Sequence, residues 1–184
     1  MRRAEPAPTG DPERDREADP ESVARAIALR LLTDAPRSRA QIAEAMRRRD
    51  VPPEVADRVL DRFTEVGLVD DAEYAAMLVR TRHQERHQSR RAIAVELRRK
   101  GVADEVAHEA LEQIDGEDEE AAARVLVRRK LASTRNLDPQ VRARRTYAAL
   151  GRRGYSPSIV AKILREELAS ESLDDDETGL PDLD

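Results

Sequence analysis

Pairs of basic residues recur at equivalent places along this 184-residue chain. The pairs are Arg48 with Arg49, Arg99 with Lys100, and Arg152 with Arg153, and each closes a segment with helical periodicity. The helix dipole stabilises cations at any helix C-terminus by about 0.3–1 kcal/mol. The pairs alone therefore do not separate a role in binding from a role in helix stability.

Further arginines lie outside these helix ends and need another explanation. They are Arg80, Arg82, Arg86, Arg90, Arg128, Arg129, Arg142, Arg144 and Arg145. At 100° per residue, Arg91 and Arg98 also lie within about 20° of each other, on the helix face away from Ile93 and Leu97. Together these cations predict a basic stripe suited to nucleic acid or to an acidic protein groove.

Residue types that carry catalysis or bind metals form no recognisable motif. The chain has no cysteine, which excludes disulfides and thiolate metal sites. His83, His87 and His108 lack metal-ligand spacing, and we interpret them as solvated helix residues. Asp70 and Asp71 could form a metal pair, but adjacent residues point to different faces of a helix and both suit its positive N-terminus, so we interpret them as caps. We expect no catalytic residue, no cofactor and no metal.

The segments that position the basic residues are related by an internal repeat. SRAQIAEAMRRRDVPPEVADRVLDRF aligns with SRRAIAVELRRKGVADEVAHEALEQI at an offset of 51 residues without a gap. A third copy follows at an offset of 53, in which Leu150 takes the place of Leu97 and Gly154 that of Gly101. Self-similarity at such a period predicts a repeat architecture, in which neighbouring copies stabilise one another by stacking.

Helix stop and start signals separate the copies. Gly67 is placed to end one helix in the left-handed conformation, and Asp70 and Asp71 to cap the next. Gly101 and Gly154 are placed to end the middle helices of the second and third copies. We therefore predict an all-α fold, a tandem array of three three-helix repeats. The predicted domains are a disordered tail (1–20), repeats over 21–69, 70–115 and 116–170, and an acidic disordered tail (171–184).

Composition and charge agree with thin helical layers and a basic body. Charged residues make up 39% of the chain and only four residues are aromatic, so the interior must be built from short aliphatic side chains. The net charge is −5, yet 29 basic and 24 acidic residues lie between Ser22 and Ser170, because the acids concentrate at both ends. Acidic ends can be plain solubilising tails or can compete with an anionic partner.

Two further properties narrow the function. No apolar run approaches the roughly 20 residues of a membrane span and no signal-peptide core follows the N-terminus, so we expect a soluble, cytoplasmic protein without a membrane partner. We also expect a monomer. Readout of bases is not expected, because single-strand binders usually stack bases on aromatic platforms that this chain lacks. The candidate second helices of helix-turn-helix pairs begin PPEV, DEVA and PSIV, which are poor in base-reading side chains.

The most specific stretch is GLVDDAEYAAMLVR followed by IAVELRRKGV. It resembles the hallmark of the RecX family, regulators of the bacterial recombinase RecA: a glycine-hydrophobic-Asp-Asp start, an aromatic residue, and a later Glu-Leu-x-x-Lys-Gly. LRLLTDAPRSRAQIAEAM resembles the first unit of that family and ALGRRGYSPSIVAKIL its third, so the resemblance runs from about Ser22 to Leu168. One departure is His87-Gln88-Ser89, where family members often carry a glycine before the second helix.

The resemblance implies an elongated, curved, non-enzymatic array that lies in the groove of the RecA filament on single-stranded DNA. Such proteins block filament extension or promote disassembly, and thereby inhibit strand exchange, DNA-stimulated ATP hydrolysis and cleavage of the SOS repressor, which ties them to DNA repair and homologous recombination. A helical-repeat DNA-binding module acting without RecA stays open as an alternative, with double-stranded DNA as a weaker ligand, as does a helical scaffold for another partner. The basic residues expected to contact RecA or DNA are Arg80, Arg82, Arg86, Arg90, Arg91, Arg98, Arg99, Lys100, Arg144, Arg145, Arg152 and Arg153.

Overall fold

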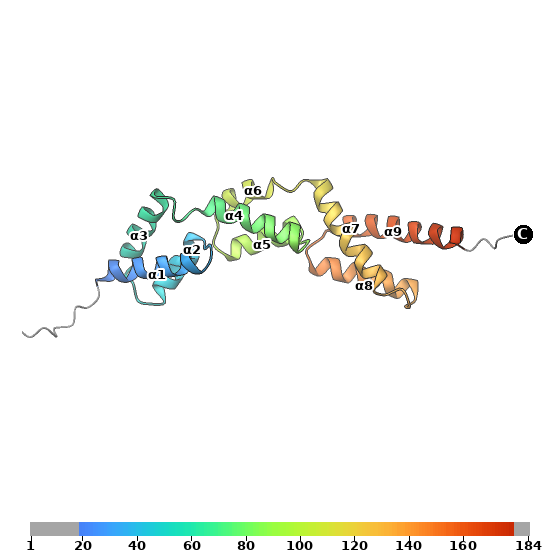
Figure 1. Cartoon of the computed structure of the whole chain (residues 1–184), viewed down its shortest axis with the longest axis horizontal. Coiled ribbons are helices and arrows are strands. Elements are labelled where there is room, and N and C mark those ends of the chain that lie inside the picture. Colours follow the sequence, from blue (N-terminus) through green and yellow to red (C-terminus); the bar gives the residue numbers. More distant parts are fainter. Residues whose placement is uncertain (1–18, 179–184) are drawn as a thin grey trace, which may run out of the picture. The chain divides into compact units, whose positions relative to one another are not determined.

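The computed structural model describes residues 19–178, with side chains through Leu173. Its elements in chain order are α1 (Pro20–Asp34), α2 (Arg39–Arg47), α3 (Pro53–Glu65), α4 (Asp71–Arg80), the π-helical turn η1 (Thr81–Glu85), α5 (Arg90–Arg99), α6 (Asp104–Leu111), α7 (Gly116–Ala132), α8 (Pro139–Arg152) and α9 (Pro157–Thr178) (Figure 1). The described residues contain no strand, so the fold is all-α with tandem three-helix repeats, as predicted. Nearly all of the tail predicted over 1–20 lies outside the described range.

Contacts divide the chain into two units, of which the first comprises residues 1–37 and 41–69. It contains α1, α3 and most of α2. Val55, Val59 and Phe63 recur every four residues in α3, so their side chains share one face, and all three are buried. They close over Ile42 and Met46 of α2, which are completely inaccessible to solvent.

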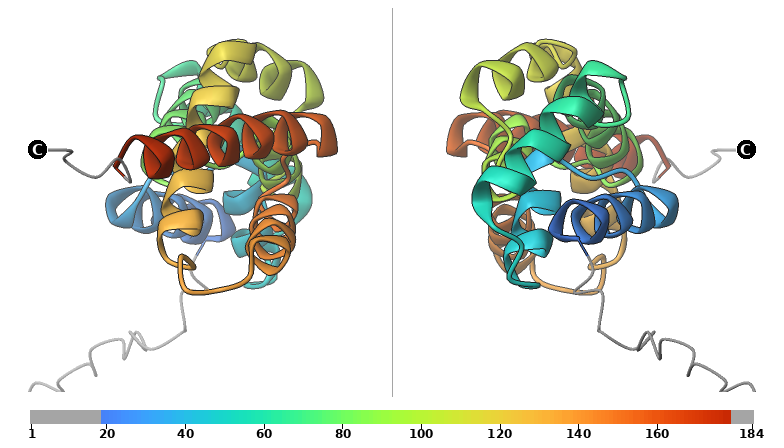
Figure 2. Two further views of the ribbon diagram at one scale, coloured as in Figure 1. Left: turned by 90° about the vertical axis from the view of Figure 1, so that its right-hand side faces the viewer. Right: turned by 90° about the vertical axis from the view of Figure 1, so that its left-hand side faces the viewer.

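The second unit comprises Ser38–Ala40 and the chain from Asp70 onward. It holds the second and third repeats, each with its own apolar cluster. Ile93 and Leu97 of α5 are fully buried against Tyr74 and Leu78 of α4 in one cluster. The other cluster joins α7, α8 and α9, with Figure 2 showing α9 lying across the pair formed by α7 and α8.

Local capping geometry explains where the helices begin. Asp70 is the N-cap of α4, where its Oδ1 accepts a 2.9 Å hydrogen bond from Glu73 N. Asp138 does the same for α8, with Pro139 in the first turn, and Asp115 with Asp118 forms a capping box on α7. Gly67, with φ of +71°, follows α3 in the left-handed region, where its amide bonds Thr64 O.

The middle helix of each repeat ends at a left-handed residue. Gly154 (φ +85°) and Gly101 (φ +75°) follow α8 and α5. Asp50 (φ +57°) takes the equivalent position after α2, so the first repeat carries a side chain where the others carry glycine. At Gly154 a Cβ would lie 2.5 Å from Ser89 Oγ and 3.0 Å from Ala92 Cβ. Both the backbone conformation and the close approach of α5 therefore require glycine at 154.

The C-terminal boundary predicted at residue 171 falls inside α9, which continues to Thr178. One ion pair with α8 reaches the predicted tail, and others hold α9 just before it. Glu171 is held by Arg142 of α8 at 2.7 Å, and Glu167 by Arg124 and Arg128 of α7 at 2.8 and 2.7 Å. Among the helices of residues 19–178, none has the length and apolar character needed to cross a bilayer.

Candidate partner-binding surface

The C-terminus of α8 meets the N-terminus of α5. Ser89, the N-cap of α5, is completely buried, and its Oγ donates a 3.0 Å hydrogen bond to the carbonyl oxygen of Arg153. The backbone N–H of Arg90 is bound in turn by a carboxylate from the next repeat, Glu119 Oε1, at 3.0 Å. The junction thus joins two middle helices end to end and leaves their polar ends satisfied.

The same pair of contacts recurs at the other end of α5, inside the second unit. Ser38 Oγ donates to the carbonyl oxygen of Lys100 at 2.5 Å, and Arg39 N donates to Asp71 Oδ1 at 2.7 Å. Asp71, which we expected to cap its own helix, therefore accepts the backbone N–H of a residue 32 positions earlier. Its repeat counterpart in this role is Glu119.

The middle helices present exposed cations on both sides of the α8–α5 junction. Arg91 and Arg144 hold equivalent positions, and both are exposed and form no ion pair within the described residues. The remaining members of this set, which we term the middle-helix cations, are Arg98, Arg99, Arg145 and Arg152, all exposed. Of these only Arg98 has a carboxylate partner in the described residues, Asp104 at 3.3 Å, and both side chains are about 71% exposed, so the pair contributes little.

Arg82 does not belong to an exposed basic surface, contrary to the sequence prediction. Its guanidinium makes two hydrogen bonds to Glu96 of α5, at 2.6 and 2.8 Å, and the two side chains are only 20% and 24% exposed. This hydrogen-bonded contact lowers the pKa of Glu96 below its ordinary value, against the opposing effect of burial. Arg82 therefore ties η1 to α5.

Other arginines of the expected stripe also serve the fold. Arg128 and Arg142 hold α9 through the ion pairs described above, and Arg142 Nη2 also donates to Leu131 O. Arg80 lies 3.5 Å from Glu73 at the surface, a weak pair. Arg86 is exposed, while Arg90 and Lys100 are half-buried at the two ends of α5.

The loop before α5 has a left-handed residue that is not glycine. His87 adopts a left-handed conformation with φ of +47°, which glycine would adopt without strain. Tyr155 from the third repeat donates its hydroxyl to His87 O at 3.0 Å, and Arg153 donates to Arg86 O. Burial, followed by the positive charges of Arg129, His83 and Arg153, lowers the pKa of His87. The loop is thus held from outside its own repeat.

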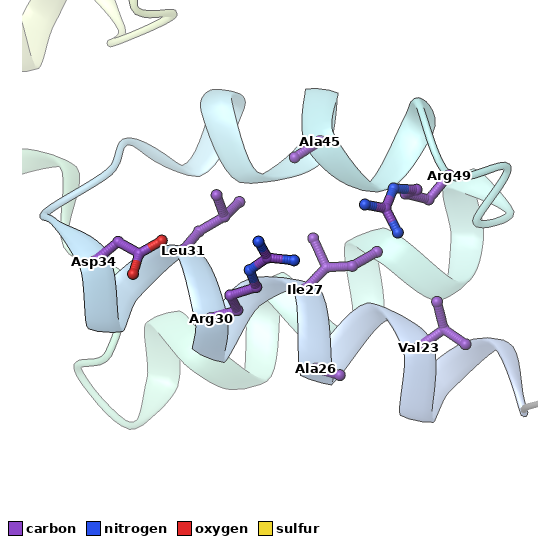
Figure 3. A pocket seen from close by; sticks show the side chains of 8 residues that line it. All are labelled: Val23, Ala26, Ile27, Arg30, Leu31, Asp34, Ala45 and Arg49. Carbon is purple, nitrogen blue, oxygen red and sulfur yellow. The ribbon is translucent and has the colours of Figure 1, made fainter.

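A separate groove of about 470 Å³ lies in the first unit, between α1 and α2. Figure 3 shows Ile27 and Leu31 pointing from α1 toward α2, with Arg49 reaching from the turn after α2 toward the same space. Asp34 joins Arg30 and Arg49 around its lining, so its charge is mixed. This mixture makes it a poorer candidate for an anionic ligand than the middle-helix cations.

No cluster of three or more potential metal-binding side chains occurs among the residues that the structure describes. His108 is exposed and lies 3.8 Å from Glu112, and His83 Nδ1 lies 3.2 Å from Gln88 O. The candidate site therefore consists of the exposed middle-helix cations and the α8–α5 junction beside them.

Fold and surface together define a tandem array of three-helix domains that presents cations along successive middle helices. Family models for the first, second and third three-helix domains of RecX match residues 24–63, 70–111 and 117–164. The chain belongs to the RecX family of regulatory proteins.

Relatives of known name support this assignment. The chain is 51% identical over 153 residues to the regulatory protein RecX of Thermobifida fusca (83% of each chain), and 47% identical over 173 residues to that of Streptomyces coelicolor (94% of this chain, 90% of the relative). The crystal structure of RecX from Lactobacillus salivarius matches with a TM-score of 0.72 at 21% identity, over 81% of this chain and 97% of that one. A second crystal structure of regulatory protein RecX matches with a TM-score of 0.70 at 26% identity, over 81% and 73%.

Proposed function

We propose that this chain is a negative regulator of RecA that binds in the groove of the RecA filament on single-stranded DNA and blocks its extension or promotes its disassembly. The proposal rests on membership of the RecX family together with one structural observation. The α8–α5 junction places two exposed, cation-bearing helices in succession, which suits an extended anionic partner. In this proposal the protein acts by binding alone, works in the cytoplasm and needs no cofactor.

The middle-helix cations carry the contact in this proposal. Arg91 and Arg144 are its best tests, because each is exposed and neither is needed by an ion pair in the described part of the chain. Arg86, Arg90, Arg99, Lys100 and Arg153 lie near the same junctions and extend the contact. Since exposed charges interact through solvent, binding should weaken steeply with added salt.

The test is co-sedimentation with RecA filaments on single-stranded DNA, with and without nucleotide, combined with inhibition of DNA-stimulated ATP hydrolysis. The variant Arg91→Glu/Arg144→Glu should bind at least tenfold more weakly and inhibit less, with unchanged helicity. The control Arg25→Glu/Arg62→Glu makes the same change in net charge at exposed residues of α1 and α3 and should behave like the natural chain. Full inhibition by the first variant would overturn the assignment of the surface.

One observation favours direct contact with DNA as a second candidate function. Tyr147 is 41% exposed on α8, close in sequence to Arg144 and Arg145, and an aromatic ring beside arginines can stack on a base of a single strand. A gel-shift titration with naked oligonucleotides at physiological salt tests this function. Tight binding with a steep salt slope supports a DNA-binding module that acts without RecA, whereas weak binding argues against it.

A further inference from the structure

A second basic feature lies between α7 and α8, apart from the middle-helix cations. It is a groove of about 320 Å³, which we term the α7–α8 groove. Leu126, Ala149 and Leu150 give it an aliphatic lining, and the cations Arg129, Lys130 and Arg153 line it as well. It contains no acidic residue, unlike the groove between α1 and α2.

The three cations of the groove are not neutralised by the folded helices. None of them forms an ion pair within the described residues, and the guanidinium of Arg153 donates only to a backbone oxygen, Arg86 O. Two of them also lie close enough to His87 for their charge to act on that ring. Like charges gathered around an apolar lining repel one another, and an anion bound among them would relieve that repulsion.

The lining indicates what kind of anion fits. It has no aromatic ring on which a base could stack, so a nucleic acid would gain little from the apolar part. An acidic peptide that carries leucines fits this lining, because its carboxylates would meet the cations and its aliphatic side chains would pack on Ala149 and on the aliphatic stems of the cations. Leu126 and Leu150 form the floor of the groove and are already buried.

The C-terminal residues of the chain have this composition. The six residues that follow α9, from 179 to 184, are GLPDLD, with two acidic residues, no base, and two leucines. We propose that this segment binds in the α7–α8 groove. The proposal goes beyond the regulatory function, since it concerns a contact of the chain with itself. An anionic partner would have to displace the segment before it could reach Arg129, Lys130 and Arg153.

The path of α9 makes this contact accessible. Glu171 is paired with Arg142, whose guanidinium also donates to Leu131 O, so Glu171 of α9 lies near the C-terminal turn of α7. Arg124 and Arg128 of α7 meet α9, and at 100° per residue Arg129 and Lys130 point away from that face, so the segment would pass around the end of α7 to reach them. Thr178 lies seven residues beyond Glu171, about 10 Å along a helix. The six residues that follow can span about 20 Å when extended.

The absence of cysteine allows a direct test in the full chain. Ser133, at the end of α7, lines the groove and is exposed. The variant Ser133→Cys/Asp184→Cys is equilibrated in glutathione redox buffers, and the effective concentration of the two thiols is measured from the fraction of intramolecular disulfide. Adding Arg129→Glu/Lys130→Glu should lower this effective concentration at least tenfold, and 1 M salt should lower it as well.

Two matched variants separate binding from loss of structure. Arg144→Glu/Arg145→Glu makes the same charge change on α8 outside the groove and should leave the effective concentration within twofold. Leu180→Ser/Leu183→Ser changes only the segment, so it leaves the groove intact and should still reduce the effective concentration. Equal values in all variants would overturn the proposal. The disulfide assay contains neither RecA nor DNA, so a negative result in it would not count against the proposed regulation of RecA. Likewise, a failure to bind RecA filaments would not count against binding of the segment in the α7–α8 groove.

Discussion

The carboxylate of Glu119 lies 3.0 Å from the backbone N of Arg90 and accepts its hydrogen bond, so α7 supplies the cap for a helix that begins 29 residues earlier. Asp71 does the same for Arg39 at 2.7 Å, which makes an acid from the first helix of one repeat the cap of the preceding middle helix. The N-terminus of α5 therefore has all of these bonds only when the third repeat is folded beside it. Loss of the Glu119 carboxylate should therefore lower the free energy of unfolding.

Glu119→Ala should lower the free energy of unfolding by about 1 kcal/mol, the usual cost of losing a capping side chain. Glu117→Ala is the control, because Glu117 lies in the same first turn of α7, where it shares the favourable interaction with the helix dipole, but is exposed. Urea denaturation of both variants measures the difference. Equal losses would show that the bond to Arg90 N adds nothing to the dipole effect.

Gly154→Ala should destabilise the chain by about 2 kcal/mol or more, because an alanine at φ of +85° is strained and its Cβ would collide with Ser89 Oγ. Gly151, one turn earlier, lies within α8, and a Cβ added there would meet no other atom within 4 Å. Gly151→Ala should therefore leave stability unchanged or raise it by up to about 1 kcal/mol. Thermal unfolding, monitored by circular dichroism, tests whether Gly154→Ala lowers the stability while Gly151→Ala leaves it unchanged or raises it.

Stability should fall as the pH drops below about 6.5, the ordinary pKa of histidine, and His87 should account for part of the fall. The pKa of His87 is lowered in the folded chain, so the unfolded state takes up its proton first and the folded state stays neutral until its own lower pKa. His87→Asn removes the titrating imidazole and keeps a residue that tolerates the left-handed backbone. The natural chain should lose more stability than the variant between pH 7.5 and 5.5, and parallel pH profiles would contradict this assignment.

Arg82→Gln should reduce stability by about 1–2 kcal/mol, because it leaves the partly buried carboxylate of Glu96 without its main partner. Arg86→Gln, at an exposed arginine four residues further on, should change stability by less than about 0.5 kcal/mol. Guanidinium is unsuitable for this comparison because it screens ion pairs, so urea denaturation is the measurement. Similar losses of unfolding free energy in the two variants would show that the pair with Glu96 does not stabilise the fold and that Arg82 behaves like an exposed surface cation.

The sequence alone determined the helices, the threefold repeat and most of the caps, because these depend on residues close together in the chain. The spacing of Ile93 and Leu97 predicts which face of α5 is buried, and Asp70 three residues before Glu73 predicts the start of α4; both features are present in the structure. Local hydrogen bonds and a period of 3.6 residues carry that information. The equivalence of Gly101 and Gly154 follows from the repeat in the same way.

Only the tertiary structure decided what each arginine does. Arg82 and Arg86 are four residues apart in one basic stretch, yet Arg82 is paired with Glu96 while Arg86 is exposed. Whether a carboxylate reaches a given guanidinium depends on how residues distant in the chain approach one another, which no local period specifies. For the same reason the cap that Glu119 provides to Arg90 and the cations that line the α7–α8 groove emerge only from packed helices, whereas the positions of those helices in the chain could be read from the sequence.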